Sequence, residues 1–179
     1  MATPPDFTAG AVLTAAQMNA VGLWRVKTQT IGTAVSTVVV SDAFSADYEN
    51  YIITVSGGIH STGAGSLTMK LGASATNYYY GATIVTYSTG AVTGTGGNNT
   101  SEWVVGMGNA SALNAHVTIM GPQLAKRTTF HSFDSNGTSQ ARNWVGYHNV
   151  STAYTEFTLG VSAGTMTGGT ITVYGYNAG

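Results

Sequence analysis

Hydrophobic and polar residues alternate with a period of two along most of this chain after residue 24. In segment 102–108, for example, Trp103, Val105 and Met107 are spaced to share one face of an extended strand. Such alternation is typical of strands with one buried face, and it predicts about ten short strands. The predicted strands span residues 24–31, 38–40, 51–55, 66–71, 78–87, 102–108, 114–120, 127–133, 142–148, 155–161 and 170–176. We therefore predict an all-β fold, an antiparallel β-sandwich that is jelly-roll-like.

Two segments between the predicted strands have the composition of loops. Residues 57–65 and 88–100 are rich in Gly, Ser, Thr and Asn and carry no charged side chain. The second is long for a connection without secondary structure, and such loops are often functional. A flexible hairpin tip is the alternative interpretation.

The start of the chain differs from the rest and predicts one short helix. Pro4 and Pro5 favour extended backbone. Thr14 and Gln17 have the spacing of a capping box, in which each side chain satisfies a backbone donor of the other. Gly22 is a suitable stop, so the helix would have about two turns.

A helix this short is marginal in water and needs a surface on which to bury its apolar side chains. That surface is either the chain's own domain or another protein of a larger assembly. We divide the chain into an attachment segment, residues 1–24, and a β-sandwich domain, residues 25–179. The candidate attachment residues are Phe7, Leu13, Met18, Val21, Leu23 and Trp24.

Three stretches resemble parts of small tail-fibre and other virion structural proteins of tailed bacteriophages. Residues 7–19 (FTAGAVLTAAQMN) resemble their opening, residues 44–55 (FSADYENYIITV) their first strands and residues 168–176 (GGTITVYGY) their closing strand. Residues 57–165 carry no such resemblance. The resemblance implies a virion protein that contacts other virion proteins through residues 1–24 and forms a homotrimer.

Composition narrows the possible functions. Charged residues make up 7% of the chain, against about 25% in ordinary soluble domains, and the net charge is −1. Nothing in this balance attracts a phosphate backbone, so we expect no nucleic-acid partner. The absence of cysteine excludes disulfides and thiolate metal sites. The apolar runs are too short to cross a membrane, and no signal-peptide layout is present. We expect synthesis in the host cytoplasm and a working location on the virion.

The titratable residues do not suggest catalysis. The four histidines form no i, i+2 or i, i+4 pair, so we predict no metal site within one copy, although a threefold axis could bring three copies of one histidine together. Asp42, Asp47 and Glu49 lack the regular spacing of an EF-hand loop. Glycoside hydrolysis requires two acids across a cleft, and the spacing identifies no such pair. We predict that the protein is not an enzyme and uses no cofactor.

One hairpin suggests a surface for sugar. Asn136-Gly137 favours a two-residue type I′ turn. That turn would place His131 opposite Arg142 and Phe133, His131, Arg142 and Trp144 on one face. Aromatic rings beside Arg and His would form a platform for a sugar ring, and ordinary cross-strand packing is the alternative.

A tyrosine-rich strand adds further candidates. Tyr78, Tyr79 and Tyr80 are consecutive, with Tyr87 nearby. Tyrosine is enriched at binding surfaces because it combines an apolar ring with a polar tip. A rim position on the sandwich is the alternative. The candidate receptor-contact residues are Tyr78, Tyr80, Tyr87, His131, Arg142 and Trp144.

These inferences lead to one functional hypothesis and several rivals. The hypothesis is a tail-fibre or receptor-binding protein that displays its β-sandwich to glycan on the host surface. The main alternative is a capsid decoration or head-fibre protein with the same architecture. A glycan depolymerase and a cellular carbohydrate-binding module are further rivals, and the former is disfavoured by the missing acid pair.

Overall fold

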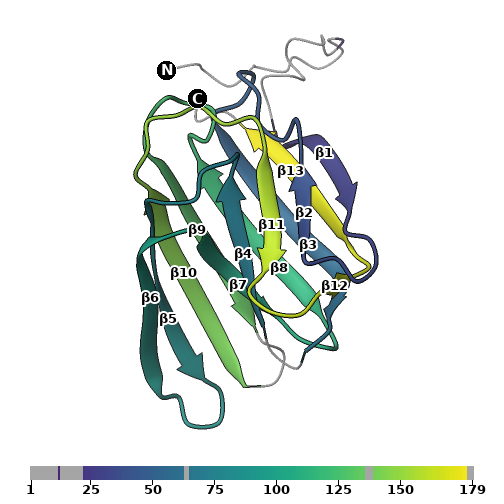
Figure 1. Ribbon diagram of the computed structural model, residues 1–179, viewed down its shortest axis with the longest axis vertical. Helices are drawn as coiled ribbons and strands as arrows, with labels where there is room; N and C mark the ends of the chain where they lie inside the picture. Colours follow the sequence, from purple (N-terminus) through teal and green to yellow (C-terminus); the bar gives the residue numbers. More distant parts are fainter. Residues whose placement is uncertain (1–11, 13–21, 63–64, 136–138, 177–179) are drawn as a thin grey trace.

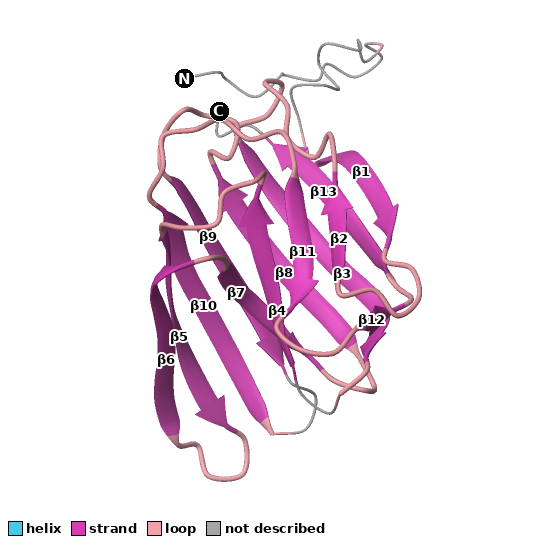
Figure 2. Ribbon diagram, viewed as in Figure 1, coloured by secondary structure: helices cyan, strands magenta, loops and turns pink. Residues whose placement is uncertain are grey.

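The fold is a two-layered antiparallel β-sandwich (Figures 1 and 2). The computed structural model describes residues 12, 22–62, 65–135 and 139–176, and these contain strands but no helix. The strands are β1 (Trp24–Thr30), β2 (Thr37–Val40), β3 (Asn50–His60), β4 (Gly65–Leu71), β5 (Tyr78–Thr86), β6 (Val92–Thr100), β7 (Trp103–Gly108), β8 (Leu113–Met120), β9 (Thr128–Ser135), β10 (Gln140–His148), β11 (Phe157–Val161), β12 (Met166–Thr167) and β13 (Thr170–Tyr176).

Strand pairing confirms the predicted sandwich and its jelly-roll character. Strand β2 pairs with β11, β3 with β8, β4 with β7 and β5 with β6, so that antiparallel pairs are nested within one another. This is the order expected for a long hairpin rolled into two layers. Strands β1, β12 and β13 extend the β3 side, and the β9–β10 hairpin is inserted between β8 and β5.

The two layers differ in width. The small sheet has the order β2-β11-β4-β7, and the large sheet has the order β1-β13-β3-β8-β9-β10-β5-β6. They connect at one corner, where Gly108 of β7 pairs with Leu113 of β8. Four strands cannot cover eight, so the large sheet extends beyond β7 as a wing made of β10, β5 and β6.

The hydrophobic core lies where both sheets overlap, and it follows the predicted alternation. Ile53 on β3 and Val117 on β8 are fully buried, as are Met69 on β4 and Leu159 on β11, all in one cluster. Among the described residues, Trp103 is the largest side chain that is fully buried. Burying one such aliphatic side chain contributes about 1.5–3 kcal/mol, so this overlap supplies the main stabilisation of the fold.

The prediction that residues 88–100 form a loop is wrong, because Val92–Thr100 is strand β6. This strand is the outer edge of the large sheet, and β5 is its one partner among the described strands. Most of its residues are exposed, so it has no apolar face and its pairing depends on backbone hydrogen bonds. The prediction of a loop at 57–65 is also partly wrong, because β3 continues to His60.

The β9–β10 register also differs from the prediction. Arg142 lies opposite Asp134 rather than His131, and His131 lies opposite Val145. The pairing is shifted by three residues, because Ala141 pairs with Ser135, whereas the predicted turn would pair it with Ser132. Because the shift is an odd number of residues, it moves Arg142 to the opposite face from His131.

Most of the predicted attachment segment lies outside the described residues, and so does its short helix. Leu23 is 48% exposed. Trp24 is the first residue of β1, where it pairs with Gly175. The candidates outside the described residues are Phe7, Leu13, Met18 and Val21.

Candidate binding cleft

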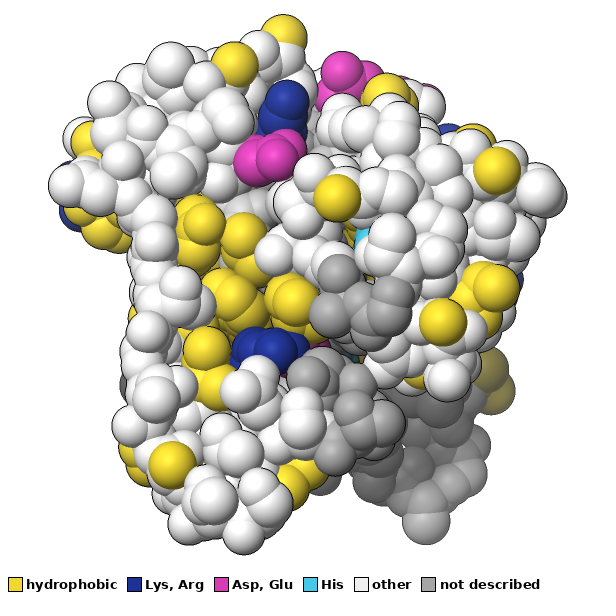
Figure 3. All heavy atoms as spheres, turned by 60° about the horizontal axis from the view of Figure 1, so that its bottom comes forward, with side chains coloured by type: hydrophobic (Ala, Val, Ile, Leu, Met, Phe, Trp, Pro, Cys, Tyr) yellow, Lys and Arg dark blue, Asp and Glu magenta, His cyan; other side chains and the backbone are white. Residues whose placement is uncertain are grey.

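A cleft opens between the wing and the free edge of the small sheet; we call it the inner cleft. Its volume is about 270 Å³. Figure 3 shows a hollow in which hydrophobic side chains surround one basic side chain. The apolar and aromatic lining residues are Tyr80, Ile84, Val104, Met107 and Trp144, and the polar ones are Ser66, Thr95 and Arg142.

Two aromatic side chains on neighbouring strands form one wall of the inner cleft. Tyr80 on β5 and Trp144 on β10 have ring centroids 6.2 Å apart and planes inclined by 53°. Tyr80 lies opposite Gly146, where a Cβ atom would be 2.9 Å from the Tyr80 Cβ. A glycine at this position therefore leaves room for the side chain of Tyr80. Tyr80 is half-buried, and burial raises the pKa of its hydroxyl.

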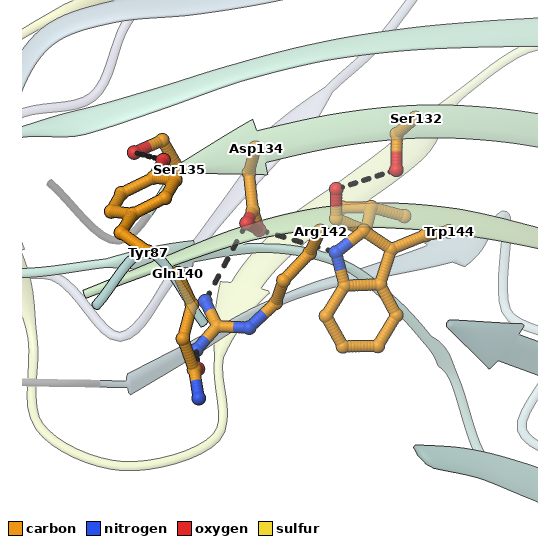
Figure 4. Close-up of polar contacts among 8 residues, drawn as sticks. Tyr87, Ser132, Asp134, Ser135, Gln140, Arg142 and Trp144 are labelled. Atoms are coloured by element: carbon orange, nitrogen blue, oxygen red, sulfur yellow. Dashed lines mark hydrogen bonds and ion pairs between the residues drawn. The ribbon is translucent and has the colours of Figure 1, made fainter. Parts of the chain in front are cut away.

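A buried polar network lies behind this wall (Figure 4). The carboxylate of Asp134 accepts a hydrogen bond from Trp144 Nε1 at 3.2 Å and one from Arg142 Nη1 at 3.5 Å. Arg142 Nη2 donates to Gln140 Oε1 at 2.6 Å. The side chains of Asp134 and Arg142 are 0% and 7% exposed. The network thus fixes the indole and the guanidinium at the base of the cleft.

Burial is the main influence on the ionisation of Asp134 in this network. Burial raises the pKa of Asp134, while the indole and the guanidinium lower it to a smaller extent. A buried carboxylate is costly unless it is paired and hydrogen-bonded, and Asp134 has both kinds of partner. Its role is therefore to hold Arg142 and Trp144 rather than to exchange protons with a ligand.

The described lining residues determine what chemistry the inner cleft offers. Among the described residues that line it, Arg142 is the one charged side chain, and none is Asp or Glu. Acid–base hydrolysis of a glycoside needs two carboxyl groups across the substrate. In the described part of the chain, no group of three His, Cys, Asp or Glu could hold a metal ion. The lining offers an apolar wall, one guanidinium and the hydroxyl groups of Ser66, Thr95 and Tyr80.

Three of the six predicted receptor-contact residues meet in this cleft: Tyr80, Arg142 and Trp144. Tyr78 instead belongs to the core. It is fully buried, its ring stacks on His148 with centroids 4.1 Å apart, and its hydroxyl accepts a hydrogen bond of 2.8 Å from the backbone N–H of Leu71. Burial raises the pKa of Tyr78 to about 12.

The other two predicted residues lie away from the inner cleft. Tyr87 is 52% exposed, and its hydroxyl donates to Ser135 Oγ at 2.7 Å. His131 is on the opposite face of the large sheet, where Nε2 is 2.7 Å from Asn143 Oδ1. The predicted platform of His131, Arg142 and Trp144 therefore does not form, because its register was wrong.

The residues of the small sheet that line the cleft were not predicted from the sequence. Met107 is in phase with Trp103 and Val105, yet it is half-buried in the cleft while they are fully buried in the core. The β4–β7 register shifts between Val104 and Gly106, as at a β-bulge. A bulge changes which face a residue occupies, and the alternation of hydrophobic residues does not show it.

Comparison of the chain with protein-family models, with curated proteins and with solved structures found no match in any of the three. None of the described residues belongs to a helix of sufficient length and hydrophobicity to span a membrane.

Proposed function

We propose that this protein is a non-enzymatic virion component of a tailed bacteriophage that binds glycan of the host surface in the inner cleft. One observation carries the binding function: the Tyr80–Trp144 wall stands beside the guanidinium of Arg142 in a cleft of about 270 Å³. Aromatic rings offer apolar area to the C–H faces of a sugar, and a guanidinium and hydroxyls bind its oxygens.

The size of the cleft indicates a small ligand. Small-molecule sites generally range from about 300 to 1,000 Å³, and this cleft is at the lower limit. A single sugar ring at the end or side of a glycan fits this limit better than a long chain. One such contact is weak, and several copies on one particle would multiply it through avidity.

The virion assignment is supported by the resemblance of residues 7–19 to phage structural proteins. In this proposal the apolar residues of the attachment segment bind other virion proteins and leave the sandwich displayed. Leu13→Asp combined with Met18→Asp should then abolish incorporation into particles while the sandwich stays folded. Unfolding of the purified double variant would instead assign these residues to the domain itself.

The binding function is tested by calorimetry of the purified protein against glycans of the host surface. Tyr80→Ala removes one aromatic ring from the inner cleft, and Tyr87→Ala removes an exposed ring outside it. We expect Tyr80→Ala to weaken binding about tenfold or more, equivalent to about 1.4 kcal/mol, and Tyr87→Ala to have no such effect. Equal affinity of Tyr80→Ala and the parent protein would refute the site.

Phage particles separate this function from the decoration alternative. Particles that carry Tyr80→Ala should retain the protein but adsorb more slowly to the host. Gold-labelled antibody should locate the protein at the tail tip. Label over the head, together with particles that lack the protein and adsorb normally but break easily, would assign it as a capsid decoration or head-fibre protein instead.

A further inference from the structure

The outward side of the large sheet carries an uncharged surface, which we call the outer face. It comprises the outward residues of β8, β9, β10, β5 and β6. On β9 these include His131 and Phe133, and on β10 Asn143 and Val145. Within the described strands, no outward residue of these five is Asp, Glu, Lys or Arg. Arg127 borders this face at one end, with its guanidinium 4.5 Å from the centre of the Tyr147 ring.

Exposed hydrophobic side chains gather on this face. Five of the eleven large hydrophobic residues that the structure exposes are located here. They are Val85, Val92, Met120, Phe133 and Val145. Phe133 is 54% exposed and stacks on His116, with centroids 5.0 Å apart. Val145 is 53% exposed on the neighbouring strand.

Val145 projects from the outer face as a ridge, and a hollow floored by glycine lies directly beside it. Val145 on β10 lies opposite Gly81 on β5, and Gly81 lies opposite Gly96 on β6. A row across three strands thus passes from a projecting valine to two residues without side chains. The hollows beside Val145 have volumes of about 330 and 400 Å³, and the stacked rings of Tyr79 and Tyr147 border the larger one.

We propose that a second copy of this chain packs on the outer face through a twofold axis, so that the ridge around Val145 of each copy fills the glycine-floored hollow of the other. A twofold interface uses the same patch on both copies and therefore must be complementary to itself. A ridge beside a hollow meets this condition. Two copies of an uncharged patch also pack together without electrostatic repulsion and without burying an unpaired charge.

The dimensions of the outer face suit such an interface. Five strands at about 4.8 Å spacing span about 24 Å, and eight residues at about 3.4 Å span about 27 Å. The resulting area, on the order of 600 Å² before side-chain relief is added, approaches the roughly 800 Å² per partner of a stable interface. The packing would resemble two sheets stacked face to face about 10 Å apart. This contact is independent of the inner cleft, which opens on the other side of the large sheet.

The test is the mass of the full-length protein in solution, measured by light scattering and sedimentation over a range of concentrations. We expect a dimer for the parent protein, in place of the homotrimer that the resemblance to phage virion proteins implied. Val145→Lys should raise the dimer dissociation constant at least tenfold. Val39→Lys is the matched control, because Val39 is 55% exposed on β2 of the small sheet, and its dimer should be unchanged.

A second variant tests the hollow rather than the ridge. A Cβ atom at Gly81 would lie 3.8 Å from the carbonyl oxygen of Thr95, an ordinary contact, so Gly81→Lys fits within one copy but fills the hollow. It should also yield a folded monomer. The proposal is overturned if the parent protein is monomeric throughout, if it is a trimer, or if its dimer persists in both Val145→Lys and Gly81→Lys.

Discussion

The indole nitrogen of Trp144 donates a hydrogen bond of 3.2 Å to Asp134, a carboxylate with no exposed side-chain surface. The two residues are on adjacent strands, and Arg142 shares the same carboxylate at 3.5 Å. The aromatic wall of the inner cleft is therefore anchored to a buried charge. As a consequence, the stability of the fold depends on contact between the Asp134 carboxylate, the Arg142 guanidinium and the Trp144 indole.

Removing the carboxylate should destabilise the fold. In Asp134→Ala, the buried guanidinium of Arg142 loses its ion-pair partner. Removing one partner of a buried ion pair lowers the free energy of unfolding by about 3–5 kcal/mol. Urea unfolding measures this loss. Replacing both residues, as in Asp134→Leu with Arg142→Met, should recover part of it because no unpaired charge remains. A double variant no more stable than Asp134→Ala would contradict this explanation.

Two neighbouring tyrosines should respond differently when their hydroxyl groups are removed. Tyr78→Phe deprives the buried N–H of Leu71 of its acceptor, and we expect a loss of about 1–3 kcal/mol in the free energy of unfolding. Among the described residues, the hydroxyl of Tyr80 makes no hydrogen bond, so Tyr80→Phe should change stability by less than about 0.5 kcal/mol. Thermal unfolding of both variants checks the difference, and equal losses would contradict it.

Gly146 should not tolerate a side chain. A Cβ atom there would collide with the carbonyl oxygen of Tyr79 and lie 2.6 Å from the Phe130 ring. Overpacking of this kind typically costs about 1–3 kcal/mol, so Gly146→Ala should lower the unfolding free energy by that amount. Gly94→Ala is the control, because its Cβ would make an ordinary contact of 3.6 Å. Similar stability of both variants would show that the wall can move to accommodate the methyl group.

The alternation of hydrophobic residues was sufficient to predict most strands and the sandwich. It succeeded where one face of a strand is buried, as at Ile53 or Val117. It failed for β6, because an edge strand exposed on both faces leaves no periodic signal and its glycines suggest a loop. Backbone pairing with β5 makes this segment a strand. A single sequence does not show which strand a segment pairs with.

The cleft was only partly predictable for a related reason. Tyr80, Arg142 and Trp144 were recognised by residue type, but their grouping depended on the register of the hairpin. A pairing register shifted by three residues from the predicted one placed His131 on the opposite face from Arg142 and Trp144. The β-bulge that turns Met107 into the cleft is similarly a local irregularity. Residue type thus identified the candidate site residues, whereas strand pairing determined which of them lie together.

His148 should make the fold sensitive to mild acid. Its Nδ1 is 3.2 Å from the carbonyl oxygen of Asn77, which can only accept, so Nδ1 carries the proton of the neutral ring. Nε2 then accepts from the hydroxyl of Tyr154 at 2.8 Å. The ring is fully buried between Tyr78 and Trp103, and burial lowers the pKa of His148 from its ordinary value of 6.5.

The direction of the pH dependence follows from this shift. Below about pH 6.5 the unfolded chain binds a proton at His148 that the folded protein resists, so stability is complete above that pH and decreases as pH falls through it. The slope contributed by one such group is at most about 1.4 kcal/mol per pH unit. The raised pKa of Asp134 acts in the opposite direction, because protonation of that carboxyl is easier in the folded state.

Urea midpoints at pH 7.5, 6.5 and 5.5 measure the effect of His148. The parent protein should lose stability between pH 6.5 and 5.5. His148→Phe keeps a ring against Tyr78 but cannot be protonated, so it should be less stable at pH 7.5 and depend less on pH. Asp134 is unchanged in this variant, and the difference in slope therefore isolates His148. Parallel curves for both proteins would show that another group controls the response to acid.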